Sequence, residues 1–277
     1  MEEEEARNWK EMEVDCLINI FQRLDLQDLI LSLPFVCKSW SKASTDPLCF
    51  RILDIPSLTF FPWTSLAKQF SPLYSLSNFS LSSFIKYFVR RSCGSLVELR
   101  LPADFSPTVD DLARVSNTCQ RLKVITLPKL MLEHEVHITE LAAKWKELER
   151  LEMGSKPSPF TRLAARISTN CKKFRALKMA GSIKREDATA IAGCFKGIKE
   201  LDLSRAYLPK EHLVVIVKGC KEIEKLILNE CVGFDSGDEE IRKLVDGIKI
   251  FESRGSVVFD DYDFENDDCD PLNVCVM

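Results

Sequence analysis

One nine-residue pattern recurs six times along this chain and restricts the folds that the chain can adopt. A Cys, Trp or Phe is followed at offsets of three, six and eight by further apolar residues, as in Cys119-x-x-Leu122-x-x-Ile125-x-Leu127. The six copies begin at Cys93, Cys119, Trp145, Cys171, Phe195 and Cys220, with successive starts 24 to 26 residues apart. A fixed period of this length indicates a repeat architecture, in which each unit buries its apolar face only against its neighbours.

Each repeat should contain one short strand and one helix. The end of the pattern alternates with period two, as a strand with one buried face requires. The residues before it have helical spacing, as at Ile138, Leu141, Ala142 and Trp145. Stacked units of this kind give an α/β solenoid, with a curved parallel sheet inside and helices outside. We therefore expect a leucine-rich-repeat solenoid of six to seven units over residues 81–259.

Capping patterns predict where three of the helices start. Thr108 with Asp111, and Ser236 with Glu239, match the spacing of a capping box. Ser158 before Pro159 predicts an N-cap followed by Pro at the first helical position.

Cysteine usage favours a reducing compartment. The chain has 11 cysteines, no run of 18 apolar residues, and an acidic start without the apolar stretch of a secretory signal. We expect no membrane span, free thiols, and a location in the nucleus, the cytoplasm or both. Cys93, Cys119, Cys171 and Cys220 share one repeat position with Trp145 and Phe195, which no metal ligand would do. They are predicted to be small buried core residues.

Charge is distributed unevenly along the chain. The formal charge is −4, but residues 2–5 carry −4 and residues 260–270 carry −7 without a cation, which leaves about +7 for the remainder. Two interpretations stay open, an acidic partner for the basic body or a surface that is simply solvated. We expect acidic tails at residues 1–8 and 260–277, the latter disordered after a last strand near Val257.

The first fifty residues have a different spacing of apolar residues. Residues 9–50 contain three short amphipathic stretches. The first carries Leu17 and Phe21, the second follows Asp25 as a helix cap, and the third opens at Pro34 and ends before Asp46-Pro47. Three such helices are too small for an independent core and need a neighbour or a partner. Residues 51–80 are predicted to hold a first strand (51–55) and an irregular junction packed through Phe60, Phe61, Trp63 and Tyr74.

This N-terminal segment resembles the F-box. The resemblance is carried by Val14-Asp-Cys-Leu17-Ile-Asn-Ile20-Phe21, by Val36-Cys37-Lys38-Ser39-Trp40 and by Asp46-Pro47. With the repeats that follow, residues 9–250 are similar to plant-type F-box/leucine-rich-repeat proteins. The sequence departs from the F-box pattern at two places, where Met12-Glu13 replaces the usual Leu-Pro and Phe50 the usual Trp.

The resemblance implies a non-catalytic substrate-recognition subunit of an SCF-type ubiquitin ligase. Its F-box would bind a Skp-type adaptor, and through it a cullin, while the repeats hold a protein target. The implied adaptor contacts are Met12, Leu17, Ile20, Phe21, Leu29, Val36, Cys37 and Trp40. The alternative interpretation is that half of them are buried inside the small helical bundle, and Trp40 could equally be a core residue or a contact. The alternative is a protein-interaction scaffold or sensor that assembles no ligase.

In a solenoid of this type the residue between the two strand leucines faces the concave side. Those positions are Asp54, Arg100, Thr126, Glu152, Lys178, Asp202 and Ile227. Their alternating signs favour a polypeptide target over a phosphate backbone, so no nucleic-acid partner is expected.

No catalytic or cofactor site is predicted. His134 and His137 stand three apart in a predicted strand-to-helix connection, but no third metal ligand is implied. Phosphate-binding loops and nucleophile motifs are missing from the sequence. We expect no metal and no cofactor.

Overall fold

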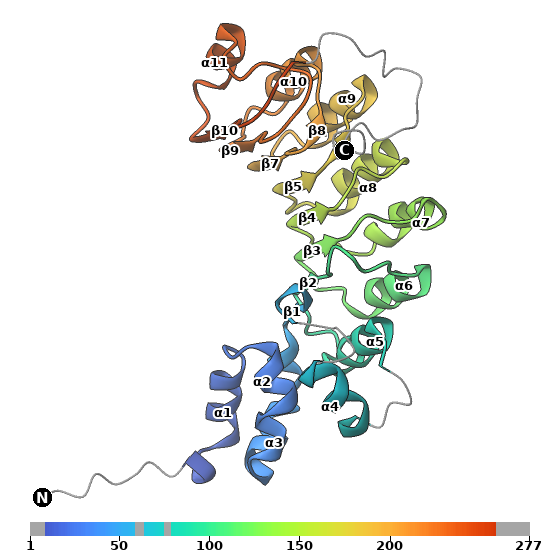
Figure 1. The fold of residues 1–277 in the computed structure, drawn as a ribbon, viewed down its shortest axis with the longest axis vertical. Coiled ribbons are helices and arrows are strands. Elements are labelled where there is room, and N and C mark those ends of the chain that lie inside the picture. Colours follow the sequence, from blue (N-terminus) through green and yellow to red (C-terminus); the bar gives the residue numbers. More distant parts are fainter. Residues whose placement is uncertain (1–8, 59–63, 75–78, 259–277) are drawn as a thin grey trace, which may run out of the picture.

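Short parallel strands alternate with helices along most of the chain and form an arc (Figure 1). The computed structural model describes residues 9–58, 64–74 and 79–258 of the 277 residues. The main sheet has eight parallel strands, β1 (Ile52–Asp54), β2 (Glu98–Arg100), β3 (Val124–Leu127), β4 (Arg150–Met153), β5 (Ala176–Met179), β7 (Glu200–Asp202), β9 (Lys225–Ile227) and β10 (Ile250–Glu252). These strands pair in chain order, which is the topology of a solenoid.

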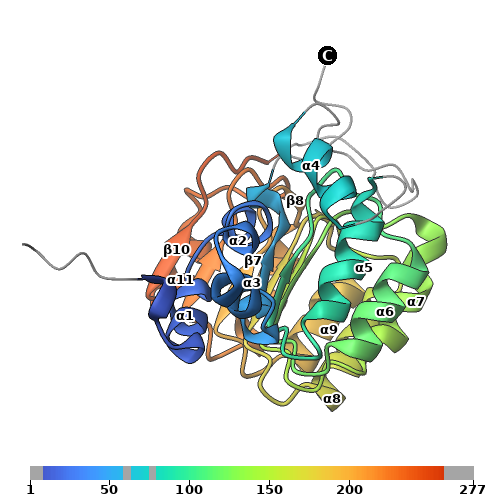
Figure 2. The same cartoon turned by 90° about the horizontal axis from the view of Figure 1, so that it is seen from below.

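The helices of the repeats lie on one side of this sheet, along the outside of the arc (Figures 1 and 2). They are α5 (Leu81–Arg91), α6 (Val109–Thr118), α7 (Leu132–Ala142), α8 (Phe160–Asn170), α9 (Arg185–Cys194), α10 (Lys210–Gly219) and α11 (Glu239–Val245). The predicted fold class, an α/β solenoid with an inner parallel sheet and outer helices, is confirmed. Strand β10 adds a unit that the six-copy pattern did not include.

The strand register explains why the pattern repeats so regularly. Leu53 pairs with Leu99, Leu99 with Ile125, and the same row continues through every strand to Phe251. From Leu53 to Leu226 these side chains are at most 2% exposed. Because side chains alternate between the faces of a strand, their neighbours on either side point to the inner surface of the arc.

A second, smaller ladder follows the main sheet near its C-terminal end. Strands β6 (Gly181–Ser182) and β8 (Ala206–Tyr207) pair in parallel, and single bridges extend this ladder from Tyr207 to Val232 and from Val232 to Val257. The strand predicted near Val257 is therefore one bridge residue. Residues 259–277, including the predicted acidic tail, lie outside the described residues, as do residues 1–8.

The N-terminal helical unit packs against the β1 end of the sheet (Figure 1). It contains α1 (Val14–Phe21), α2 (Leu26–Leu31) and α3 (Lys38–Ser44), with short 3-10 helices at Trp9–Glu11 (η1), Leu33–Phe35 (η2) and Pro47–Phe50 (η3). Asp25 caps α2 by accepting a hydrogen bond from the Asp28 amide at 2.8 Å, as predicted.

The third helix starts later than predicted. Pro34 lies in η2, and α3 begins at Lys38, with Cys37 in extended conformation as its N-cap. Val36 and Cys37 thus precede the helix. Pro fixes its own φ and lacks an amide proton, so it suits the first turn of either a 3-10 or an α-helix and does not by itself choose between them.

The junction predicted as irregular is partly helical. It contains the 3-10 helix η4 (Ile55–Ser57) and α4 (Ser65–Leu73), whose Phe70 ring packs at 4.9 Å between ring centroids from Phe84. The Tyr74 hydroxyl donates a 2.9 Å hydrogen bond to the Ile30 carbonyl of α2. These contacts join the helical unit to the first repeat. Phe60, Phe61 and Trp63 lie outside the described residues.

Two of the three predicted helix starts need correction. Thr108 and Asp111 form the expected capping box on α6. The N-cap of α11, however, is Asp238, which accepts the Glu240 amide at 2.8 Å, and not Ser236. The N-cap of α8 is Pro159, one residue later than predicted, because the Ser158 amide and hydroxyl both donate to the buried Glu135 carboxylate at 2.7 Å.

The repeat cysteines are buried with one exception. Cys119, Cys171 and Cys220 are at most 3% exposed, as predicted, and burial raises the pKa of the Cys119 thiol to about 12. Cys93, by contrast, is exposed and adopts a left-handed conformation with φ 46°. It lies two residues after the end of α5, and the prediction of burial was wrong there.

Candidate interaction surfaces

Some of the predicted contact residues lie inside the helical unit, and others lie at its surface. Leu17, Phe21 and Leu29 are at most 3% exposed and form its core. Met12, Ile20, Cys37 and Trp40 are partly buried, and Val36 is 49% exposed.

Trp40 is partly buried and makes two contacts within the helical unit. Its ring packs edge-on against Phe21, with 5.2 Å between ring centroids. Its indole N–H donates a 3.2 Å hydrogen bond to the Trp9 carbonyl, which ties η1 to α3. Trp9 itself is 47% exposed.

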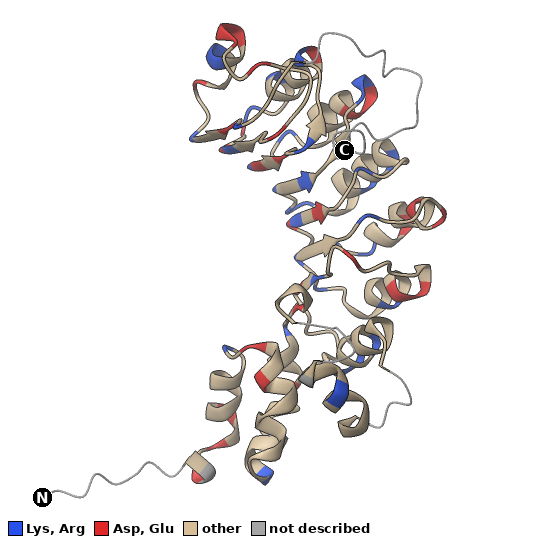
Figure 3. Cartoon of the chain, viewed as in Figure 1, with Lys and Arg blue, Asp and Glu red and all other residues tan. Residues whose placement is uncertain are grey.

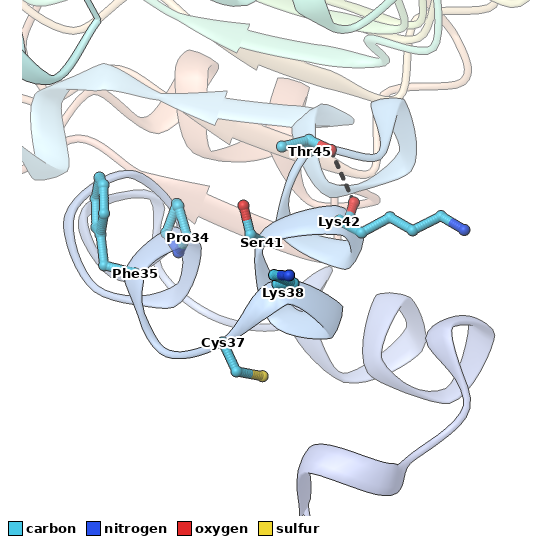
Figure 4. A pocket seen from close by; sticks show the side chains of 7 residues that line it. All are labelled: Pro34, Phe35, Cys37, Lys38, Ser41, Lys42 and Thr45. Atoms are coloured by element: carbon cyan, nitrogen blue, oxygen red, sulfur yellow. Dashed lines mark hydrogen bonds between the residues drawn. The ribbon is translucent and has the colours of Figure 1, made fainter.

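A shallow groove opens between η2 and α3 (Figure 4). It is lined by Pro34, Phe35, Cys37, Lys38, Ser41, Lys42 and Thr45. Phe35 is 57% exposed, and with Val36 it places two adjacent apolar side chains at the surface. The sequence prediction missed Phe35, because its position in a 3-10 turn falls outside the apolar helical face. Adjacent exposed apolar residues beside a groove are typical of a binding surface.

The concave surface carries the predicted row of side chains in register. Asp54, Arg100, Thr126, Glu152, Lys178, Asp202 and Ile227 are successive Cα partners across the seven strands β1 to β9. All seven are partly or fully exposed. The structure therefore brings the whole predicted row together on the inner face of the arc.

Charges in this row pair with one another. Arg100 contacts Asp54 at 3.5 Å and also Glu98, and Lys178 contacts Asp202 at 3.3 Å. The Thr126 hydroxyl donates to Glu152 at 3.3 Å. Neighbouring strands are about 4.8 Å apart, which places opposite charges within reach of each other.

Arg150 and Glu200 form a further ion pair beside this row, with 2.7 Å between the charged groups. This pair joins strands β4 and β7, which are separated by β5. Together with Glu152, Lys178, Asp202 and Lys225 its two residues surround a hollow in the inner face. Cations and carboxylates are equal in number there, so the hollow favours a partner with both signs of charge over a polyanion.

The described residues contain no group of His, Cys, Asp and Glu arranged to hold a metal ion. His134 and His137 lie within helix α7, which corrects their predicted place in a connection. Among the helices that the structure describes, none is long and apolar enough to cross a membrane.

The helical N-terminal unit and the repeat arc together define a class of protein, in which an F-box is joined to a leucine-rich-repeat solenoid. A family model for the F-box domain matches residues 9–52. An F-box/LRR-repeat protein of Arabidopsis thaliana is 27% identical over 230 residues, covering 82% of this chain and 74% of its own. The F-box protein FBW2 of the same organism is 25% identical over 280 residues, covering 97% and 82%. The chain is similar over most of its length to plant F-box/leucine-rich-repeat proteins, and its residues 9–52 match the F-box domain.

Proposed function

We propose that this protein is the substrate-recognition subunit of an SCF-type ubiquitin ligase. Its F-box would bind a Skp-type adaptor, and through it a cullin, and its arc would hold a protein target for ubiquitination. The observation that carries the proposal is an F-box with apolar side chains at its surface, joined to an open arc through one continuous hydrophobic core. The chain itself would perform no catalysis and would act in the nucleus, the cytoplasm or both.

Adaptor binding would use the surface part of the predicted set together with Phe35, which the sequence prediction missed. Phe35 and Val36 offer apolar area that a partner can bury, at roughly 25 cal/mol per Å² of area removed from water. Met12, Ile20, Cys37 and Trp40 would contribute their exposed edges. Leu17, Phe21 and Leu29 would act indirectly, by holding α1 and α2 in place.

A pull-down with a purified Skp-type adaptor tests this assignment. Phe35→Asp and Val36→Asp should each weaken binding at least about tenfold, since each puts a charge where apolar area would be buried. Leu132→Asp is the matched control, because Leu132 is 76% exposed on α7, away from the F-box. Failure of the intact, folded chain to bind any adaptor would refute the ligase assignment and favour a scaffold or sensor without ligase activity.

The target would occupy the concave row. Arg100 and Lys178 project from strands two and five of the sheet, so reversing either charge should weaken target capture. The readout is co-purification of targets from cells in which the ligase is inhibited, with Lys86→Glu on the outer helix α5 as control. Adaptor binding should be unchanged in all three variants. A joint loss of both activities would indicate unfolding instead of a recognition defect.

A further inference from the structure

The two edges of the solenoid carry opposite charge. Because all strands are parallel, every helix-to-strand turn lies at one edge and every strand-to-helix connection at the other. We define the basic rim as six segments in which a helix ends and the next strand begins, residues 118–123, 143–149, 170–175, 195–199, 218–224 and 246–249. It holds twelve Lys and Arg against five carboxylates, a formal charge of +7.

The opposite edge is acidic by the same amount. The connections 101–111, 128–135, 154–159, 180–187, 204–211 and 229–240 hold six cations against thirteen carboxylates, a formal charge of −7. Figure 3 colours these charges along the arc. An approaching anionic partner is therefore attracted to one edge and repelled from the other, which fixes the side of approach.

Helix capping does not account for the basic rim. Cations stabilise a helix C-terminus mainly within its last turn. Helices α6, α7, α8 and α9 have no basic residue in the last turn, so their rim cations follow the helix end. Lys172 is one rim cation that contacts a helix carbonyl, that of Ser168 at 3.3 Å.

Ion pairing within the rim leaves a large part of its charge free. Lys173, Lys123 and Lys199 each contact a rim carboxylate between 2.6 and 3.2 Å. Seven other cations make no ion pair with any carboxylate that the structure describes, and all seven are exposed. They are Arg121, Lys146, Lys172, Arg175, Lys196, Lys218 and Lys221.

The rim lacks the features of a nucleic-acid site. Single strands bind by stacking their bases on exposed aromatic rings. The aromatic residues in the rim are Trp145, Phe174 and Phe195, and Trp145 and Phe195 are at most 4% exposed. Phe174 packs on Phe195 with 4.9 Å between ring centroids.

We propose that the basic rim is a docking surface for an acidic stretch of a partner polypeptide. Successive turns repeat at about the 4.8 Å strand spacing, so six turns extend roughly 25 Å, which about eight residues of extended chain would cover. Glutamates or aspartates on one side of such a chain would meet the unpaired cations. This surface differs from the concave row and from the F-box groove, and it does not depend on the ligase assignment.

Fluorescence anisotropy on the full chain tests the proposal. The probe is a labelled peptide of about twelve residues that alternates Glu and Gly. The combined variant Lys172→Glu, Arg175→Glu, Lys196→Glu breaks no ion pair of the structure, and it should weaken binding at least about tenfold at low salt. The matched control Lys68→Glu, Lys86→Glu, Arg162→Glu reverses as many exposed charges outside the rim and should change affinity less than about twofold.

Three outcomes would overturn the proposal. Equal weakening by both combined variants would show a general charge effect instead of a site. Tighter binding of a labelled oligouridylate of the same length would assign the rim to nucleic acid. Binding that appears only after the seven carboxylates of residues 260–270 are changed to amides would show that the chain occupies its own rim.

Discussion

The Arg150 guanidinium reaches over strand β5 to the Glu200 carboxylate, 2.7 Å away, although the two residues are not on neighbouring strands. Ala176 is the Cα partner of both and lies between them. Its methyl side chain leaves space for Arg150, and it is only 4% exposed in this position. A larger residue at 176 would separate the pair.

A double-mutant cycle should measure this pair. With side chains 34% and 40% exposed, Arg150→Ala and Glu200→Ala should show a coupling free energy of about 0.5 kcal/mol in urea unfolding. The Arg205–Glu230 pair, 70% and 64% exposed, is the control and should show almost no coupling. Coupling that is equal in the two pairs, or unchanged at about 1 M salt, would contradict the assignment of a partly shielded ion pair.

Gly219 is predicted to be required for the contact between α9 and α10. A Cβ added there would lie 2.3 Å from the Ala192 Cβ, so Gly219→Ala should destabilise the protein by about 1–3 kcal/mol. Gly193→Ala is the matched control on α9, since nothing lies within 4 Å of its added Cβ. It should be neutral or raise the free energy of unfolding by up to about 1 kcal/mol. Urea unfolding of both variants measures the two changes in the free energy of unfolding, and equal changes would contradict the prediction.

Buried thiols should make the protein sensitive to alkaline pH. Burial raises the pKa of Cys119 to about 12 and the pKa values of Cys171 and Cys220 to about 11, from an ordinary value of 9.0. The unfolded chain ionises first, so this contribution to stability is complete below pH 9.0 and is lost as pH rises through 11 to 12. Thermal unfolding midpoints across this range measure it.

Thiol labelling provides the companion measurement to the pH series. Cys16 and Cys93 are exposed and should react at neutral pH in the folded chain, whereas Cys119 should react only on unfolding. Peptide mapping by mass spectrometry assigns each site. Rapid labelling of Cys119 under native conditions would be incompatible with its place in the core.

Helix capping gives a fourth prediction. Thr108→Ala removes the side chain that accepts the Asp111 amide at 3.2 Å and should cost about 1 kcal/mol. Asp238→Ala should have a similar effect at α11. Ser236→Ala should be neutral, because Ser236 does not cap the helix. A cost at Ser236 equal to that at Asp238 would show that the cap forms differently in solution.

The sequence predicted the repeats well because they are periodic. An error at one position, such as the burial of Cys93, does not alter the count or the register of the other units. Local boundaries were predicted less well. Pro34, Ser158 and Ser236 each match a helix-start signal, but α3, α8 and α11 begin at later residues. At Ser158 a residue distant in sequence is involved, because Glu135 accepts both hydrogen bonds from Ser158. That acceptor lies 23 residues away and cannot be inferred from the local pattern.

For the interaction surfaces, the concave row followed from the alternation of side chains on a strand, which depends on backbone geometry alone. The surface of the F-box did not follow, since an apolar helical face looks the same in sequence whether it packs inward or binds a partner. Only the folded unit separated buried Leu17 and Phe21 from exposed Phe35 and Val36.

The solenoid, its unit length and the row of inner side chains could all be predicted before folding, because each depends on the period of the apolar residues. Which charges meet could not be predicted in this way, since it depends on how the repeats stack. Arg150 pairs across an alanine with Glu200, and the cations of six separate turns gather along one edge. Both arrangements arise when parallel strands stack in register, which brings residues about 25 positions apart to within one strand spacing.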